Sequence, residues 1–566
     1  MPIPRSLLPR EVPTDHDLRV PGGTWPAGLR GELVISAPHP ATFDGPHPFF
    51  GEGMLYRLSL QPGTFGAGPD EFAWRQRRID TPSARLRAAR PDVFTPSMMG
   101  VQSPYGVVNA ANTAPLPWGD RLFTTWDVGR PVEVDPVTLG FLGDVGHRDQ
   151  WQVFEVTPQP VLPLVMSTAH PVIDPDRDVM WTVNTFWGQL HIVRWDGEGP
   201  VQTWPVDGAV IPQSVHTITQ TREWLIVADC AFKVEPQVLS GGDRTEPANH
   251  DGPVYLIRKD QLEATPPGQP VPCHTFRVAP ENNHYYAVYD DSDGIQVLFE
   301  HTENAELAMT QREGDLDALG RPCDPALRGL YGFPMSPDRT TLIAFDPDSG
   351  TQLHRAELRD PQRLWTRQLN AMDWSTEGMA RPTSHHMVNQ GWRPEAITQR
   401  VLALYGDRVD RTLCPPTGPR PGWVPRSRDA RAVAAEYELA MVGSPPPPVF
   451  VPRDPDAAGT SRYAGSDPGG HDGWVVLPVM NDAGFRVEVF DAADVGRGPV
   501  ATLSKPGMHV PFVLHAAWML QATPADDRPR LRFADELSRV GELPDDLAAV
   551  ALQVAADLDE GVPLDA

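Results

Sequence analysis

The sequence predicts an all-β fold of the β-propeller type, on three observations. Short runs of β-branched and aromatic residues recur along nearly the whole chain, and most are bounded by Gly, Pro, Asp or Asn. These runs do not alternate regularly with helical patterns, which favours a propeller or a barrel over a βαβ sheet. Four histidines are separated by 46 (216 − 170), 85 (301 − 216) and 214 (515 − 301) residues. Because a propeller blade takes roughly 40–50 residues, these gaps correspond to about one, two and five blades, so all four side chains could point at a metal on the axis.

The individual elements follow from local patterns. Strands are predicted in ten runs, at residues 29–38, 52–61, 120–127, 178–185, 189–195, 222–229, 252–258, 294–300, 473–480 and 485–491. Apolar residues near helical spacing predict helices over 394–409 and 545–561. Two segments dense in Pro, Gly, Asp and Ser, 415–431 and 444–473, are predicted as surface loops. We expect one domain over 1–524 and an acidic, helical C-terminal extension over 525–566.

Composition limits the classes of function. The 566 residues include 64 Pro and 48 Gly scattered without a period, which indicates many turns between short strands. A net charge of −26 argues against nucleic acid as a partner. The four cysteines form no C-x-x-C pair, and no apolar run is long enough for a secretory signal or a membrane span, so we expect a cytoplasmic protein with reduced thiols.

Several short motifs surround the histidines. His170 lies in STAHPVIDP, His216 in SVHTITQT, His301 in FEHTENAE and His515 in HVPFVLHAAW. Further landmarks are GELVISAPHP and FFGEGM near the start and PVFVPR and HDGW near the end. Between them, the segment ANTAPLPWGDRLFTTWDVGRPVEVDPVTLGFLG ends in a Pro-x-x-x-Asp-Pro-x-Thr-Leu pattern. In this order, the motifs resemble those of the carotenoid cleavage oxygenase family over most of residues 30–520.

That resemblance implies a seven-bladed β-propeller with an axial metal site and a helical and loop cap over one face. It also implies one Fe²⁺ per chain held by His170, His216, His301 and His515, with O₂ as co-substrate. The expected reaction is cleavage of a carbon–carbon double bond in an apolar, apocarotenoid-like or other conjugated alkene, giving two carbonyl products. Four neutral imidazoles suit a borderline divalent metal such as Fe(II), and they are not the two-His, one-carboxylate set of cosubstrate-dependent oxygenases. The adjacent pair His385 and His386 is an alternative chelate, which we interpret as structural.

Carboxylates that support the ligand histidines are where the chain departs from the family. A ligand histidine normally donates its second ring N–H to an acceptor, and loss of that acceptor costs about 10–100-fold in metal affinity or activity. Three glutamates have this role in the family. Here Asp127 stands at the first position and Pro447 at the second, and Glu395 is the candidate for the third. Either the site is adapted to an unusual reaction, or it binds metal weakly and is catalytically degraded.

The substrate is less well specified by the sequence. In the family branch that cleaves phenolic stilbenes, a lysine precedes the first of these glutamates, and here the position is Trp126, which argues against a phenolate ligand. Trp126, Tyr105 and Phe512 are candidate substrate-lining aromatics, although Tyr105 and Phe512 could equally pack in the core. A propeller that binds an apolar ligand without catalysis, and an isomerase or lyase on the same fold, stay open as alternatives. Contact with a membrane surface is also open, and the oligomeric state is not predicted.

Overall fold

The structure is a computed structural model of the 566-residue chain. It describes residues 15–39, 48–94, 102–154, 158–233, 235, 242–361, 364–365, 367–369, 384–389, 391–414, 423–428, 432–438, 447–453, 472–481, 484–562 and 564.

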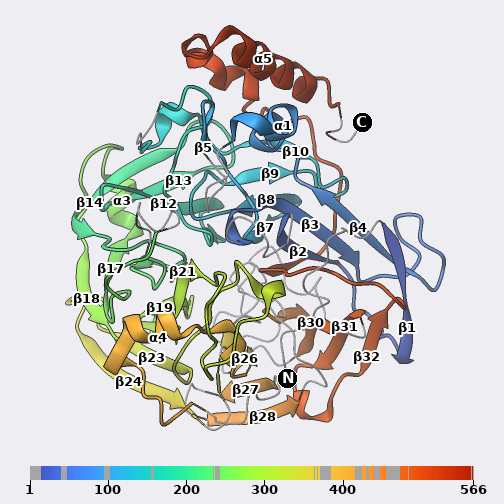
Figure 1. Ribbon diagram of the computed structural model, residues 1–566, viewed down its shortest axis with the longest axis vertical. Helices are drawn as coiled ribbons and strands as arrows, with labels where there is room; N and C mark the ends of the chain where they lie inside the picture. The colour runs from blue at the N-terminus through green and yellow to red at the C-terminus, as the bar shows by residue number, and fades with distance from the viewer. Residues whose placement is uncertain are drawn as a thin grey trace.

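Antiparallel sheets are arranged in a ring around a common centre, which is the architecture of a β-propeller (Figure 1). Five of these sheets are separate and have four strands each. The first two are β7 (Ala114–Trp118), β8 (Arg121–Thr125), β9 (Val132–Val134) and β10 (Phe141–Asp144), and then β11 (Val172–Asp174), β12 (Val179–Phe186), β13 (Gln189–Trp195) and β14 (Gln202–Val210). The next two are β15 (Ile218–Gln220), β16 (Trp224–Ala228), β17 (Gly252–Arg258) and β18 (His274–Val278), and then β19 (Asn282–Ala287), β20 (Ile295–His301), β23 (Arg339–Phe345) and β24 (Gln352–Arg359). The fifth is β25 (Arg367–Leu369), β26 (Ser384–Asn389), β27 (Trp423–Arg428) and β28 (Ala432–Glu438).

A nine-stranded sheet joins the two ends of the chain. It runs in the order β29-β30-β31-β32-β1-β4-β3-β2-β33, so it consists of two four-stranded blades bridged by β1. Its members are β29 (Val449–Pro452), β30 (Gly473–Asn481), β31 (Gly484–Asp491), β32 (Ala501–Ser504), β1 (His16–Gly23), β4 (Phe72–Arg78), β3 (Glu52–Ser59), β2 (Glu32–His39) and β33 (Ala516–Met519). The C-terminal strand β33 therefore completes the blade made by the N-terminal strands, with Glu32 opposite Met519 and Ile35 opposite Ala516.

The inner strands of neighbouring blades touch one another, β11 against β15, β15 against β19, and β33 against β7. Because these five blades present their first or innermost strand to the axis, residues at the start of those strands can meet there. The faces between blades are filled with apolar side chains, and one core cluster runs through Trp181, Trp204 and Leu225.

All ten predicted strands are present, in β2, β3, β8, β12, β13, β16, β17, β20, β30 and β31. The loop prediction for 415–431 is wrong at β27, and that for 444–473 is wrong at β29. Both strands are short, and the Pro and Gly residues that flank them on the chain mask their pattern.

Two small sheets lie beside the blades, β5 (Gln102–Ser103) with β6 (Gly106–Val107) and β21 (Glu306–Thr310) with β22 (Tyr331–Gly332). The α-helices of the described residues are short: α1 (Pro82–Ala89), α3 (Lys259–Ala264), α4 (Gln399–Tyr405) and α5 (Asp545–Asp559). The predicted helical segment 394–409 contains α4 between two 3-10 turns, Pro394–Ala396 and Gly406–Arg408.

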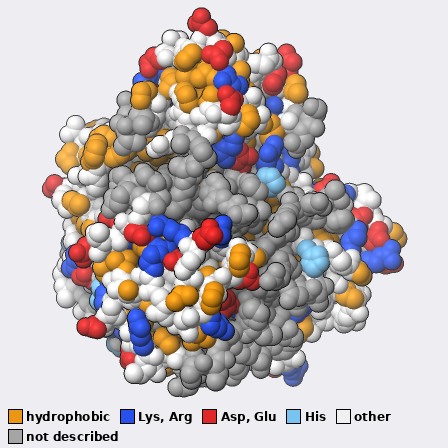
Figure 2. All heavy atoms as spheres, in the orientation of Figure 1, with side chains coloured by type: hydrophobic (Ala, Val, Ile, Leu, Met, Phe, Trp, Pro, Cys, Tyr) orange, Lys and Arg blue, Asp and Glu red, His pale blue; other side chains and the backbone are white. Residues whose placement is uncertain are grey.

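The C-terminal segment packs on the outside of the propeller, where α5 contacts α1 and the 3-10 helix Phe533–Glu542 (Figure 1). Leu547 of α5 is buried in an apolar cluster with Leu86 and Phe533. The buried Glu536 forms an ion pair with the buried Arg130, at 3.0 Å. Hydrophobic side chains also gather on the outer surface of this region (Figure 2), and Leu552 is 53% exposed.

Candidate metal centre

Four histidines from four blades converge at the axis of the propeller. They are His170, His216, His284 and His515, and one ring nitrogen from each lies within 4.8 Å of the others. The ring centroids of His170 lie 4.4 Å from His515 and 4.9 Å from His216. The centroid of His284 lies 5.0 Å from that of His216 and 5.3 Å from that of His515. Three of the four histidines expected from the sequence are therefore in the cluster, and the fourth member is one that the sequence analysis did not select.

Each of these side chains is placed by the start of an inner strand. His170 and His216 come two residues before β11 and β15, His284 lies on β19, and His515 comes directly before β33. The His515 segment is fixed to β2 by two backbone hydrogen bonds, from Ser36 N to His515 O and from Leu514 N to Ser36 O, each 2.9 Å.

The segments that carry His170 and His216 are bound directly to one another. His170 N donates to His216 O at 3.2 Å, and Ile218 N donates to His170 O at 3.3 Å. The hydroxyl of Thr168 also donates to His216 O, at 2.6 Å. These bonds fix the separation of the segments that carry His170 and His216, independently of any contact between the two rings.

Asp127, which follows β8, holds His216. Its Oδ1 lies 2.9 Å from His216 Nδ1 and accepts a second hydrogen bond from Ala169 N at 3.1 Å. The carboxylate therefore orients the His216 ring and also binds the backbone next to His170. Asp127 is close to His216, as expected of a carboxylate that supports a ligand.

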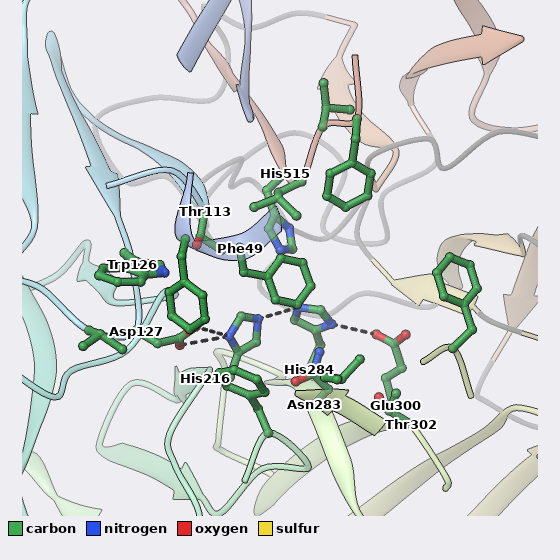
Figure 3. Close-up of a pocket in the computed structure, with 18 of the residues that line it drawn as sticks. Phe49, Thr113, Trp126, Asp127, His216, Asn283, His284, Glu300, Thr302 and His515 are labelled. Atoms are coloured by element: carbon green, nitrogen blue, oxygen red, sulfur yellow. Dashed lines mark hydrogen bonds and ion pairs between the residues drawn. The ribbon is translucent and has the colours of Figure 1, made fainter. Parts of the chain in front are cut away.

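Glu300 on β20 has the same relation to His284. His284 and Glu300 are paired across β19 and β20, and Glu300 Oε2 lies 3.2 Å from His284 Nδ1 (Figure 3). Glu300 is 4% exposed, so this contact is inside the protein. Neither residue of this pair was among the candidates that the sequence suggested.

His301 does not belong to the cluster, and the expectation that it does is corrected by the structure. Successive side chains of a strand point to opposite faces. Because Glu300 faces the axis, His301 faces away from it. Both ring nitrogens of His301 already have partners, since Nδ1 lies 2.8 Å from Pro280 O and Nε2 lies 2.7 Å from the Thr341 hydroxyl. Burial lowers the pKa of His301 to about 3, so the ring is neutral and structural.

The two remaining histidines are deeply buried. Burial and the neighbouring imidazoles lower the pKa of His170 well below its usual range, and the same causes lower the pKa of His515. Among the described residues, His515 Nδ1 has no hydrogen-bond partner. His170 and His515 are thus neutral imidazoles.

This donor set fits a divalent metal ion. Because Nδ1 of His216 and of His284 each face a carboxylate, those nitrogens carry the protons and the Nε2 atoms carry lone pairs. The two Nε2 atoms face one another at 3.2 Å (Figure 3). Two lone pairs at that distance repel unless a cation lies between them, and neutral imidazole is a good ligand for Fe(II) and its neighbours.

An apolar cavity of about 130 Å³ opens beside the histidines. Its walls carry His216, His284, His515, Asp127 and Glu300, together with polar groups at Thr113, Asn283 and Thr302. The apolar part of the lining consists of Phe49, Phe50, Trp126, Val128, Phe232, Leu307, Phe333, Pro334, Phe512, Val513 and Leu514. No lysine or arginine is among these described lining residues, so the cavity suits a neutral ligand.

Trp126 and Phe512 line this cavity, as expected of substrate-lining residues, whereas Tyr105 does not. Tyr105 packs in a core cluster, with its ring centroid 6.3 Å from that of Phe94. Trp126 belongs to the same cluster, so the sequence pattern of a buried aromatic residue does not show whether its side chain also reaches the cavity.

Glu395 is also outside the centre, and its candidacy is corrected. It lies in the 3-10 turn Pro394–Ala396, where its carboxylate is 4.0 Å from the Arg393 guanidinium and its carbonyl accepts from Gln311. Glu300 supplies the carboxylate instead. Pro447 is buried next to β29, and His386 is buried outside the cluster; the side chain of His385 lies outside the described residues.

Comparison with known proteins assigns the chain to a family. The family model for RPE65, the retinal pigment epithelial membrane protein, matches residues 8–520. The chain belongs to the carotenoid cleavage oxygenase family. A rice (Oryza sativa subsp. japonica) relative in this family, the chloroplastic carotenoid cleavage dioxygenase 7, is 32% identical over 146 residues, which are 25% of this chain and 22% of the rice protein. The match thus spans about a fifth of the length of that relative.

Solved structures of carotenoid cleavage oxygenases share the fold of this member. A lignostilbene dioxygenase of Pseudomonas brassicacearum superimposes with a TM-score of 0.59 at 17% identity, covering 92% of this chain and 99% of that one. A point mutant of the Synechocystis apocarotenoid oxygenase gives a TM-score of 0.58 at 17% identity, covering 91% and 98%. A cobalt-substituted form of the same Synechocystis protein gives 0.57 at 17% identity, covering 91% and 98%.

Within the described residues of this family member, no helix is both long and apolar enough to cross a membrane.

Proposed function

We propose that the protein is a non-haem Fe(II)-dependent dioxygenase that cleaves a carbon–carbon double bond of an apolar conjugated alkene. One O₂ is consumed for each alkene, and each former alkene carbon receives one oxygen atom, giving two carbonyl products. The observation that carries this proposal is the meeting of His170, His216, His284 and His515 beside an apolar cavity. Membership of the carotenoid cleavage oxygenase family supports it.

The residues of the chain have separable tasks in this reaction. The four imidazoles would hold the iron, which supplies a redox-active centre for O₂ when it is bound. Asp127 and Glu300 keep the Nδ1 protons of His216 and His284, so that both Nε2 atoms are available as ligands. The aromatic walls exclude water and orient the alkene beside the centre.

The lining of the cavity indicates the chemical class of the substrate. Trp126 and Phe50 make an edge-to-face pair with centroids 5.7 Å apart, and Phe49 and Phe232 make another at 6.4 Å. Such surfaces bind flat conjugated groups through apolar contact and ring stacking. Because the described lining provides no cation, we propose a neutral substrate such as an apocarotenoid aldehyde or alcohol, or a non-ionised stilbene.

The test compares two histidines of the same hairpin. We expect wild-type protein purified without oxygen to bind about one Fe(II) per chain and His284→Ala to lose it together with activity. The matched control is His301→Asn, which removes the histidine expected from the sequence but leaves the cluster intact, and we expect it to keep its iron. Circular dichroism and thermal unfolding establish that both variants fold.

Loss of iron in His301→Asn but not in His284→Ala would contradict the assignment of ligands. Alkene cleavage is measured on a panel of neutral and anionic conjugated alkenes, with labelled O₂ to follow the oxygen atoms into both products. Iron binding without cleavage of any of them would contradict the proposed activity.

A second candidate is a propeller that binds an apolar ligand without catalysis. It is favoured by His515, whose Nδ1 is buried without an acceptor among the described residues, and by Pro447, which stands where the family has a supporting glutamate. Tight binding of a neutral alkene by protein that takes up no Fe(II) would support this candidate over the dioxygenase.

A further inference from the structure

The C-terminal segment, residues 525–562, lies beyond the family match, which ends at residue 520. Its two helical parts are the 3-10 helix Phe533–Glu542 and α5, and α5 lies beside α1 on the outside of the propeller (Figure 1). The family resemblance does not account for this segment. Its role therefore has to follow from its own contacts.

The first part of the segment is held against the outer edge of the blade that contains β7 to β10. Ala525 N donates to Asp135 Oδ2 at 2.8 Å. The chain then passes close to Gly143 of β10, where an added Cβ would lie 2.8 Å from Leu531 O. A side chain at Gly143 would thus push the segment away from the blade.

Charged groups hold the second part. The carboxylate of Glu536 is buried, and its Oε1 accepts from Arg130 Nη1 at 3.0 Å and from Arg148 N at 3.1 Å. At the surface, Arg90 Nη1 donates to Asp546 Oδ2 at 2.8 Å, which joins the start of α5 to the end of α1. The segment is therefore docked on the propeller at several points along its length.

One buried apolar cluster contains side chains of this segment and side chains of the cavity wall. Those of the segment include Leu537, Leu547, Ala551 and Val554. Those of the wall are Phe50, Trp126 and Val128. None of residues 525–562 is among the described residues that line the cavity, so the segment forms the layer behind the wall.

Phe50 and Trp126 are the large side chains of this wall. Their rings are paired edge to face with centroids 5.7 Å apart, and both are buried. Protein interiors are close-packed, so a buried ring keeps its position only while the layer behind it is filled. Removal of that layer would let the two rings move outward and would widen the cavity.

We propose that the C-terminal segment determines substrate specificity. By packing behind Phe50, Trp126 and Val128, it sets the width of the cavity and excludes alkenes with bulky substituents. This inference rests on the proposed function, because it takes an apolar alkene as the ligand of the cavity. It adds an element outside the family match to the residues that select the substrate.

The experiment uses two substitutions in α5 that introduce the same charge into the full-length protein. Leu547→Asp places a carboxylate in the buried cluster, whereas Leu552→Asp places one at an exposed position of the same helix. Hydrogen–deuterium exchange followed by mass spectrometry reports whether the wall is loosened. Equilibrium dialysis under argon gives the Kd of trans-stilbene, a slim neutral alkene, and of the same stilbene with a tert-butyl group on each ring.

We expect Leu547→Asp to speed exchange in α5 and also in residues 121–128, while exchange in residues 218–228 of a distant blade stays unchanged. The Kd of the bulky stilbene should fall relative to that of the slim one by about tenfold or more, a change of the size that pocket shape produces. Leu552→Asp should match the wild type in both measurements.

Faster exchange in α5 with unchanged exchange in residues 121–128 and an unchanged ratio of the two Kd values would overturn the inference. Equal changes in Leu547→Asp and Leu552→Asp would also overturn it. If Leu547→Asp fails to fold, Leu547→Ala is compared with Leu552→Ala, and the same ratio decides.

The outcome is separable from that of the proposed function. If the ratio changes as expected but the wild type cleaves no alkene, the role of the C-terminal segment stands and the activity is contradicted. If the wild type cleaves an alkene and the ratio is the same in all variants, the activity stands and the inference is contradicted. If the wild type binds neither stilbene, the inference is overturned, whereas cleavage of another alkene still supports the activity.

Discussion

At the scale of single residues, the centre depends on which face of a strand a side chain occupies. Glu300 and His301 are neighbours in sequence, yet one contacts a cluster histidine and the other bonds to Pro280 and Thr341. A shift of β20 by one residue would exchange their positions, so the register of this hairpin selects the donor set.

Asp229, which follows β16, leads to a prediction about pH. Burial raises the pKa of Asp229 to about 7, although its carboxylate accepts hydrogen bonds from Gln213 N at 2.8 Å and Gln213 Nε2 at 2.9 Å. An aspartate in the unfolded chain titrates near 3.9. The folded state therefore binds the proton more tightly, and the free energy of unfolding falls as the pH rises from about 4 to 7.

The variant Asp229→Asn has no such titration. We expect the wild type to lose stability relative to Asp229→Asn across this pH range, by on the order of 1.4 kcal/mol for each unit of the shift in pKa. Urea unfolding of the two proteins at a series of pH values measures this difference. Parallel stability curves from pH 4 to 7 would show that Asp229 is ionised in the folded protein throughout.

At the scale of elements, helix α5 contributes to stability through one face only. Leu547 is 4% exposed and Leu552 is 53% exposed, and both lie in the same helix of 15 residues. We expect Leu547→Ala to lower the free energy of unfolding by about 2–5 kcal/mol, because a buried leucine leaves a cavity. The matched change Leu552→Ala should cost less than about 0.5 kcal/mol.

Chemical denaturation of both variants checks this pair. Equal effects of the two substitutions would mean that the C-terminal segment is not docked through the face that contains Leu547, Leu86 and Phe533.

At the scale of the whole molecule, the centre connects blades that are far apart in sequence. Its histidines come from the blades that contain β11, β15, β19 and β33, and β33 lies in the blade of β2 to β4. A metal bound there would link residues 170–284 to the C-terminal segment that carries His515. Binding to the folded state alone stabilises it by about 2.7 kcal/mol when the free metal is 100 times the Kd.

We therefore expect Co(II) to raise the Tm of wild type and of His301→Asn, and to leave that of His284→Ala nearly unchanged. Differential scanning calorimetry at several Co(II) concentrations measures the rise. A concentration-independent Tm in wild-type protein would indicate that the four histidines do not act as one site.

The sequence was sufficient to predict the strands and to select three of the four histidines of the cluster. The physical reason is different for the strands and for the histidines. Strands such as 294–300 are marked by β-branched and aromatic runs between turn residues, which is a local property. His170, His216 and His515 are marked by their motifs next to the inner strands.

His284 was missed because blade length is not constant. The gap from His216 to His284 is 68 (284 − 216) residues, yet it crosses a single blade, since a segment of more than 20 residues lies between β16 and β17. The count of two blades up to His301 was therefore wrong. One signal could have pointed to His284. Neighbouring strand residues face opposite sides, so Glu300 and His301 cannot both face the axis, whereas His284 lies in the strand that begins its blade.

The ring is closed by β33, and this has a consequence for how the protein is made. The segments with His170, His216 and His284 leave the ribosome early, whereas His515 follows 231 (515 − 284) residues after His284. Chains are synthesised from the N-terminus at about 5–20 residues per second. The fourth histidine is therefore added on the order of ten seconds or more after the third. Full coordination is thus possible only after the segment that precedes β33 has been made, so an occupied centre indicates that β33 has joined the blade of the N-terminal strands.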